Sequence, residues 1–146
     1  MRVVAISGFF NPLHIGHIDY ISAARNLGDY LIVIVNSDDQ VEMKGSVPFM
    51  NQDDRLTIIR NIKGVDRCII AIDDDGSVCN TLREEFKRLQ NDPFFEDMIF
   101  ANGGDRKKGY VPESVLEDEL GIVMVYNIGG GKIQSSSDLI KNSQKF

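Results

Sequence analysis

Apolar residues gather into five short runs, and longer segments that mix polar and apolar residues separate these runs. Short runs rich in Val and Ile are typical of strands that are buried on both faces of a sheet. The five predicted strands are Arg2–Ser7, Tyr30–Asn36, Arg67–Ile72, Asp97–Asn102 and Ile122–Asn127.

The intervening segments carry helix signals. Apolar residues recur at three-residue steps from Ile15 to Leu27, which predicts a helix with Gly28 as its C-cap. The segment Ser37–Met50 is predicted to be a polar loop. Four further helices are predicted. One follows the capping residue Asn51, one runs from Ser77 to about Gln90, one covers Pro112–Leu120 before Gly121, and the last begins with Ser135–Asn142.

Strands and helices therefore alternate along the whole chain. This alternation predicts a single doubly wound α/β domain over residues 1–146, with a five-stranded parallel sheet. In such sheets a ligand lies beyond the carboxyl ends of the strands, where the strand order reverses. Each polar loop that follows a strand is a candidate wall of that site.

Composition narrows the class of protein. The chain has 146 residues, of which 42% are apolar and 26% charged, as in an ordinary globular domain. Its net charge of −6 argues against nucleic acid as a partner. No apolar run is long enough for a membrane helix and no signal peptide is evident, so we expect a cytoplasmic protein. Cys68 and Cys79 are expected to be buried, inert thiols.

Candidate chemistry lies in the stretch SGFFNPLHIGHIDYI, directly after the first strand. His14 and His17, the two histidines of the chain, are one helical turn apart at a predicted helix start. A helix N-terminus attracts anions, and Gly8 and Gly16 leave room for a ligand to approach. Two alternatives stay open: a purely structural histidine pair, and a zinc site, although zinc needs further ligands.

Two other segments allow more than one interpretation. Ser135, Ser136 and Ser137 follow GGGK at a predicted helix start, where they form either a second phosphate site or an ordinary serine cap. Asp73–Asp75 closes the third strand, and its carboxylates are either metal ligands or acids at the start of the next helix.

The motif GFFNPLHIGH resembles the signature of the HxGH nucleotidyltransferases, the superfamily of glycerol-3-phosphate cytidylyltransferase. The similarity continues through Lys44, Arg55, GGDR at Gly103–Arg106 and IQSSSDLI at Ile133–Ile140. It implies a Rossmann-like nucleotidyltransferase fold and a homodimer. Class I aminoacyl-tRNA synthetases share the HxGH pattern, but they need further domains.

The resemblance implies transfer of a nucleoside monophosphate to a phosphorylated acceptor, with release of pyrophosphate. Its catalytic residues would be His14, His17 and Lys44, with Mg²⁺ on the triphosphate and no metal ligands from the protein. Arg55 is either a phosphate fork or a surface partner of acids such as Asp53. The implied nucleotide-binding residues are Gly8, Phe9, Phe10, Asn11, Gly16, Arg55, Gly104, Asp105, Ser135, Ser136 and Ser137.

The sequence indicates the type of reaction more clearly than it indicates which nucleotide is used. Glycerol-3-phosphate cytidylyltransferases carry RTEGIST before their last helix, and this chain has Gly130 at the position of the arginine in that motif. It also has Ser46 where those enzymes have a second lysine. Asn11 stands where cytidylyltransferases commonly have Asp, and VNSD with Lys44–Gly45 is similar to heptose-phosphate adenylyltransferases. We predict CTP with a phosphorylated small alcohol or sugar. The alternatives are ATP with heptose 1-phosphate, and nucleotide binding without catalysis.

Overall fold

A five-stranded parallel sheet forms the centre of the protein, as the strand pattern predicts. The computed structural model describes residues 1–104 and 111–129, so Asp105, the three serines and the predicted last helix lie outside the described residues. Strand order is β3-β2-β1-β4-β5, and every neighbouring pair is parallel. The strands are β1 (Arg2–Gly8), β2 (Tyr30–Val35), β3 (Arg67–Ile70), β4 (Asp97–Gly103) and β5 (Val123–Ile128).

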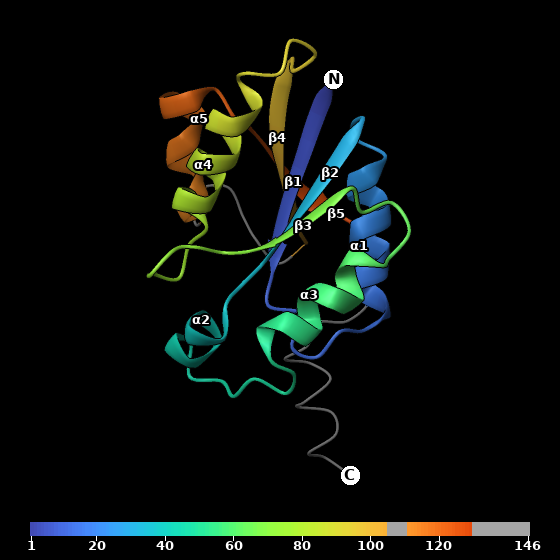
Figure 1. Ribbon diagram of the computed structural model, residues 1–146, viewed down its shortest axis with the longest axis vertical. Coiled ribbons are helices and arrows are strands. Elements are labelled where there is room, and N and C mark those ends of the chain that lie inside the picture. The colour runs from blue at the N-terminus through green and yellow to red at the C-terminus, as the bar shows by residue number, and fades with distance from the viewer. Residues whose placement is uncertain (105–110, 130–146) are drawn as a thin grey trace.

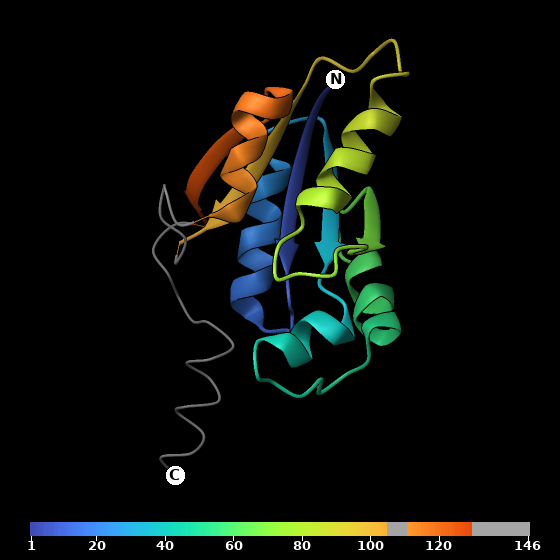
Figure 2. The ribbon, with the colours of Figure 1, turned by 90° about the vertical axis from the view of Figure 1, so that its left-hand side faces the viewer.

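Helices cover both faces of the sheet, so the fold is doubly wound (Figures 1 and 2). Successive residues of β1 point to opposite faces: Val4 packs toward Ile21 and Ile59, whereas Val3 packs toward Leu82 and Leu116. The first face carries α1 (Ile15–Arg25) and α3 (Gln52–Arg60); the second carries α4 (Cys79–Leu89) and α5 (Val115–Leu120), which follows the 3₁₀ turn η1 (Pro112–Ser114).

The predicted inner face of α1 is correct only in its second half. Ile21 and Ala24 are fully buried, but Ile15 is 66% exposed. An α-helix turns about 100° per residue, so residues at three-residue steps drift around the axis and Ile15 lies opposite Ala24. Gly28 is not the C-cap, which is Asn26. A Cβ on Gly28 would lie 2.7 Å from the carbonyl oxygen of Arg2, so close packing against β1 requires this glycine.

The predicted polar loop after β2 contains a helix, α2 (Asp38–Met43). Ser37 caps it by accepting the N–H of Gln40, while the Gln40 side chain accepts the N–H of Ser37. Asp38 and Asp39 occupy the first turn, where carboxylates favour the helix dipole. The loop prediction is therefore wrong at this point, because a reciprocal cap stabilises a helix too short to show an apolar period.

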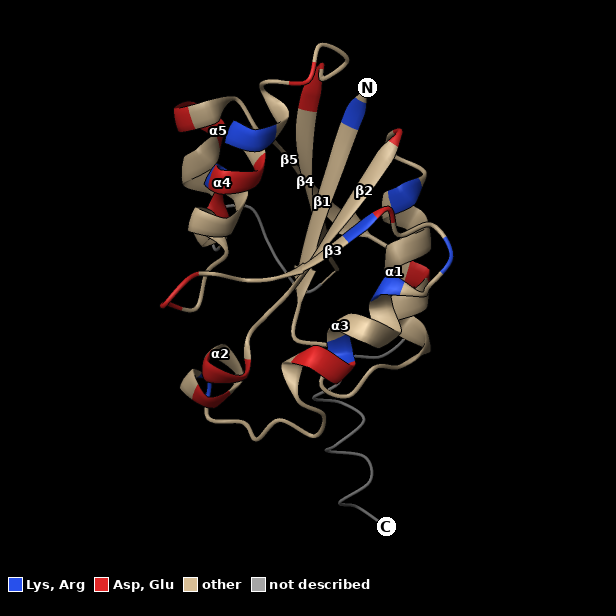
Figure 3. Ribbon diagram, in the orientation of Figure 1, with Lys and Arg blue, Asp and Glu red and all other residues tan. Residues whose placement is uncertain are grey.

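The carboxyl ends of the strands meet α2 and the N-terminal ends of α1 and α3 at one edge, at the bottom of Figure 1. The strand order reverses between β1 and β4, which places a ligand site at this edge. In Figure 3, the charged residues of α2 are acidic, whereas acidic and basic residues are interspersed over α3 and α4. None of the helices in the described segments is long and apolar enough to cross a membrane.

Candidate active site

The loop from β1 to α1 folds back over the strand end. Phe10 has a left-handed backbone (φ 51°), and its ring is buried over Gly8. A Cβ on Gly8 would lie 2.8 Å from the Phe10 ring. The space that Gly8 leaves, expected to admit a ligand, is therefore filled by Phe10. The same ring packs edge-on against the imidazole of His17, at 5.0 Å between centroids, so Phe10 supports the histidine pair.

His14 and His17 cap the first turn of α1 reciprocally. Nδ1 of His14 accepts the N–H of Gly16 at 3.0 Å, and Nδ1 of His17 accepts the N–H of His14 at 3.1 Å. The two rings stack with their centroids 3.9 Å apart. Both rings thus have a structural role in the helix cap, and each imidazole uses only one nitrogen for it.

This arrangement fixes the protons of both rings. Because each Nδ1 is an acceptor, a neutral ring carries its proton on Nε2. Nε2 of His14 is buried and has no hydrogen-bond partner in the structure. Burial, together with a smaller effect of the neighbouring His14 ring, lowers the pKa of His17 to about 4; burial also lowers the pKa of His14. At neutral pH the pair therefore presents two N–H donors without a charge of its own.

The depressed pKa of His17 predicts an acid-sensitive fold. The unfolded chain binds a proton at His17 near pH 6.5, whereas the folded chain binds it only near pH 4. Between these values the unfolded state holds more protons than the folded state. The contribution of His17 to the unfolding free energy is therefore complete above pH 6.5 and is lost as the pH drops. At pH 5 the loss from this group is about 2 kcal/mol.

Urea unfolding at pH 7.5 and pH 5.0, on the wild type and on His17→Asn, measures this contribution. Asn keeps a side-chain acceptor close to its own backbone but does not titrate. We expect the unfolding free energy of the variant to fall about 2 kcal/mol less over this range than that of the wild type. Equal losses in the two proteins would show that His17 is not the titrating group.

Lys44 reaches the same loop from α2. It is the C-cap residue of that helix, and its Nζ lies 3.8 Å from the centroid of the Phe9 ring, a cation–π contact. Burial of the ammonium lowers the pKa of Lys44 below its ordinary value. Phe9 immediately precedes Phe10, so the structure brings Lys44 to the loop that leads into the histidine pair.

Arg55 is fully buried, so it is not a surface partner of Asp53. Its guanidinium donates to the carbonyl oxygens of Phe9 (2.7 Å), Asn36 (2.7 Å) and Met50 (3.1 Å), and to the carboxylate of Asp38 (2.7 Å). These bonds use four of its five N–H groups. A two-pronged phosphate contact would have to break at least one of them. Arg55 thus ties together the ends of β1 and β2 and the loop before α3.

Asn11 holds a loop in place. Its Nδ2 donates to the carbonyl oxygen of Val47 (2.9 Å), and its Oδ1 accepts the N–H of Phe49 (2.7 Å). An aspartate could accept the second bond but could not donate the first. The choice of Asn over Asp therefore suits this loop, and on its own it carries little information about the nucleotide.

The remaining predicted residues divide between the two sides of the strand-order reversal. Gly16 lies in the first turn of α1, and its N–H completes the His14 cap. Gly104 follows β4, the neighbour of β1, and is exposed at the carboxyl edge. Asp105, Ser135, Ser136 and Ser137 lie outside the described residues, so their nucleotide-binding role stays a prediction.

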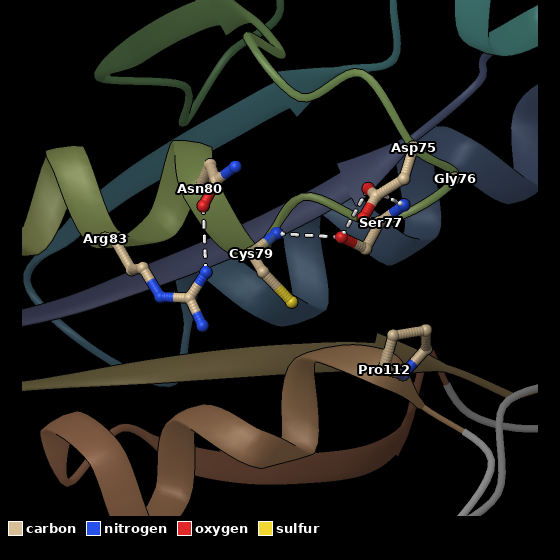
Figure 4. Close-up of a pocket in the computed structure, with 7 residues that line it drawn as sticks. All are labelled: Asp75, Gly76, Ser77, Cys79, Asn80, Arg83 and Pro112. Carbon is tan, nitrogen blue, oxygen red and sulfur yellow. Dashed lines mark hydrogen bonds between the residues drawn. The ribbon is translucent and has the colours of Figure 1, made fainter.

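A pocket of about 470 Å³ lies on the opposite face, between the β3–α4 loop, the start of α4 and Pro112 (Figure 4). The N–H groups at this helix start are already satisfied. Asp73 accepts those of Asn80 and Thr81, and Glu113 accepts that of Val78. For Asp73 the helix-start interpretation is therefore correct. Because its anion-binding groups are occupied, this pocket is a weaker candidate than the histidine site.

The sequence interpretation missed Asp38 and Gln40, which connect α2 to the site. Asp38 is the carboxylate partner of Arg55, and Gln40 is 1% exposed and fully hydrogen-bonded. A signal was present, because Ser37-x-x-Gln40 is a capping-box pattern. The contacts that these side chains make with distant strands have no local signature.

Comparisons with known proteins identify the family of the chain. A family model described as cytidylyltransferase-like matches residues 5–124. A solved structure titled as a lipopolysaccharide core biosynthesis protein from Thermoplasma volcanium superposes with a TM-score of 0.64 and 30% identity, covering 88% of this chain and 95% of that one.

Two kinds of curated relative cover different shares of the chain. FAD synthase of Thermoplasma acidophilum is 39% identical over 75 residues, which cover 51% of this chain and 52% of that protein. The bifunctional protein HldE of Aliarcobacter butzleri is 32% identical over 146 residues, which cover 99% of this chain and 27% of that protein. The chain thus matches about half of the FAD synthase and about a quarter of HldE.

Proposed function

Because the chain belongs to the cytidylyltransferase-like family, we propose that it is a nucleotidyltransferase that moves AMP from ATP onto the phosphate of a small molecule and releases pyrophosphate. The observation that carries this proposal is the His14–His17 pair. Two Nε2–H donors are held one turn apart at a helix start, beside the reversal of strand order. Neutral, preorganised donors suit the charge that develops on phosphate oxygens during transfer.

ATP replaces CTP as the favoured nucleotide. The sequence alone favoured CTP because the chain is short and resembles a minimal cytidylyltransferase. FAD, the product named for one group of relatives, contains an adenylate. The sequence resemblance to heptose-phosphate adenylyltransferases supports the same nucleotide, and the family name does not decide the question.

For the acceptor we favour a sugar phosphate, because the HldE alignment spans the chain from end to end, whereas the FAD synthase alignment covers half of it. FMN is the second candidate and rests on the FAD synthase similarity. Both are phosphate monoesters. In either case an acceptor oxygen bonds to the α-phosphorus of ATP, and the bond from that phosphorus to the β-phosphate oxygen breaks.

The residues divide this work by position. His14 and His17 donate through Nε2–H to oxygens of the α-phosphate, where negative charge increases in the transition state. Lys44 supplies the positive charge and approaches from α2, over the ring of Phe9. Arg55 and Asn11 act behind the site by holding the loops that carry these groups. Phosphoryl transfer depends more on alignment of the reactants and neutralisation of the phosphate charge than on covalent chemistry by the protein.

We propose that Mg²⁺ accompanies the triphosphate and neutralises part of its charge. Among residues 1–104 and 111–129, no three His, Cys, Asp or Glu side chains gather into a cation site. The Nε2–H of His14 is a donor without a partner in the structure, which suits a phosphate oxygen and not a cation. The ion would therefore reach the site on the nucleotide and keep water ligands.

A pyrophosphate-release assay tests the function. ATP, CTP, GTP and UTP are each combined with heptose 1-phosphate, FMN or glycerol 3-phosphate, in the presence of Mg²⁺. We expect release with ATP and heptose 1-phosphate at a rate at least about tenfold above that with CTP, which corresponds to about 1.4 kcal/mol of discrimination. At about 100 times its Kd, ATP alone should stabilise the fold by about 2.7 kcal/mol, read as a rise in Tm.

Other outcomes would select the alternatives. Release with CTP alone would restore the cytidylyltransferase interpretation, and release with ATP and FMN alone would identify the second acceptor. A rise in Tm with a nucleotide, but no pyrophosphate from any combination, would favour a nucleotide-binding protein without turnover.

A further inference from the structure

Gln40 connects two elements that bear on the site. Its Oε1 accepts from Asn36 Nδ2 (2.9 Å) and from the N–H of Ser37 (3.0 Å), at the end of β2. Its Nε2 donates to the carbonyl oxygens of Asp75 (2.8 Å) and Ser77 (2.9 Å), in the loop after β3 shown in Figure 4. The side chain is 1% exposed, and all four of its hydrogen-bonding positions are used.

These bonds extend a polar network across three strand ends. The carbonyl oxygen of Asn36 also accepts from Arg55, which donates in turn to Phe9 after β1. Gln40 continues this network to the loop after β3. The ends of β1, β2 and β3 are thereby joined through two buried side chains, beneath the short helix that carries Lys44.

A cap alone does not require this residue. The capping bond at Ser37 needs only a side-chain acceptor, which Glu supplies as well as Gln. The bonds to Asp75 and Ser77 need a donor, and Glu offers none when ionised. The amide therefore performs a second task, which is to fix α2 against the loop after β3. That task has a consequence for Lys44, whose backbone N–H donates to the Gln40 carbonyl at the end of the same helix.

We propose that Gln40 is a positioning residue for Lys44: by bridging α2 to the β3–α4 loop, it holds the Lys44 ammonium over Phe9, at the phosphate side of the site. The role of Lys44 in transfer rests on the proposed function. The position of Lys44 does not, and it can be measured separately.

The positional test uses NMR of the protein after reductive ¹³C-methylation of its lysines. The Phe9 ring should shift the Lys44 methyl signal upfield; Lys44→Arg identifies that signal, and Phe9→Leu shows the shift without the ring. Gln40→Met and Gln40→Glu should each lose most of the upfield shift. Gln90→Met, at the exposed C-cap of α4, is the matched control and should keep it.

The kinetic test is a double-mutant cycle. We expect Gln40→Glu to lower kcat about tenfold while KM for ATP changes less than about threefold, as misplacement of a group that acts on the transition state predicts. In a Lys44→Ala background the same substitution should lower kcat no further, because Lys44 is the group through which Gln40 acts.

An unchanged Lys44 signal in the Gln40 variants would overturn the inference. An equal fall in kcat with and without Lys44 would also overturn it, because a general weakening of the fold acts in both backgrounds. If the wild type releases no pyrophosphate, the proposed function fails, and the NMR shift still decides whether Gln40 positions Lys44.

Discussion

His14→Asn should lower kcat by about 10²- to 10³-fold while the fold remains intact. Asn is among the best N-cap residues, and its Oδ1 can accept the Gly16 N–H that Nδ1 of His14 accepts now. The substitution removes the Nε2–H donor, which is buried and has no partner in the described structure, together with the ring that stacks on His17. The loss therefore falls on the transition state and not on the helix.

Measurement of kcat, of ATP affinity by calorimetry and of Tm separates these effects. We expect ATP affinity to change much less than kcat, because the donor acts most strongly where charge develops. His14→Ala is the matched comparison: it removes the cap as well and should cost about 1 kcal/mol more in unfolding free energy than His14→Asn. Normal turnover in His14→Asn, together with a lower Tm in His14→Ala, would show a capping role only.

Arg55→Met should lower the unfolding free energy by about 3 to 5 kcal/mol. Met fills much of the volume but leaves the Asp38 carboxylate and the carbonyl oxygens of Phe9, Asn36 and Met50 without their donor. Buried acceptors that lose their partners cost about 1 to 3 kcal/mol each, although Asp38 remains 31% exposed and is partly rehydrated. Arg55→Lys should recover little, because one ammonium cannot reach acceptors in four directions.

Urea unfolding measures this loss, and Arg60→Met provides the control. Arg60 lies at the end of the same helix but is exposed, so its substitution should change stability by less than about 0.5 kcal/mol. A stable Arg55→Met protein with a raised KM for ATP would instead favour the phosphate fork. The experiment thus decides between the internal tie found in the structure and the phosphate fork that the resemblance implies.

Most of the fold could be predicted from the sequence, because its signals are local. Runs such as Tyr30–Val35 can be stable only when both faces are covered, and this property predicts a parallel sheet. Gly121 has the left-handed backbone expected of a C-cap. Helix α2 was missed because six residues are too few to show a period. Gly28 was misassigned because the atom that excludes a Cβ, the carbonyl oxygen of Arg2, is distant in sequence.

The site was predicted in part. The spacing of His14 and His17 indicated one turn at a helix start, and the structure shows that turn. The roles of Gly8, Asn11 and Arg55 could not be predicted, because each depends on a partner that is not specified by local sequence. Phe10 fills the space beside Gly8. The backbone of residues 47–49 forms hydrogen bonds with the Asn11 amide, and carbonyl oxygens of three segments accept hydrogen bonds from Arg55.

By itself, the sequence determined the strands, the alternation that makes the sheet parallel, and the presence of two imidazoles at the first helix start. These features depend on residue type and short-range spacing, which a chain carries whatever its fold. Only the tertiary structure decided that Arg55 and Gln40 are internal ties and that Lys44 lies over Phe9. Each depends on hydrogen bonds or ring contacts between segments that come together only when the chain folds.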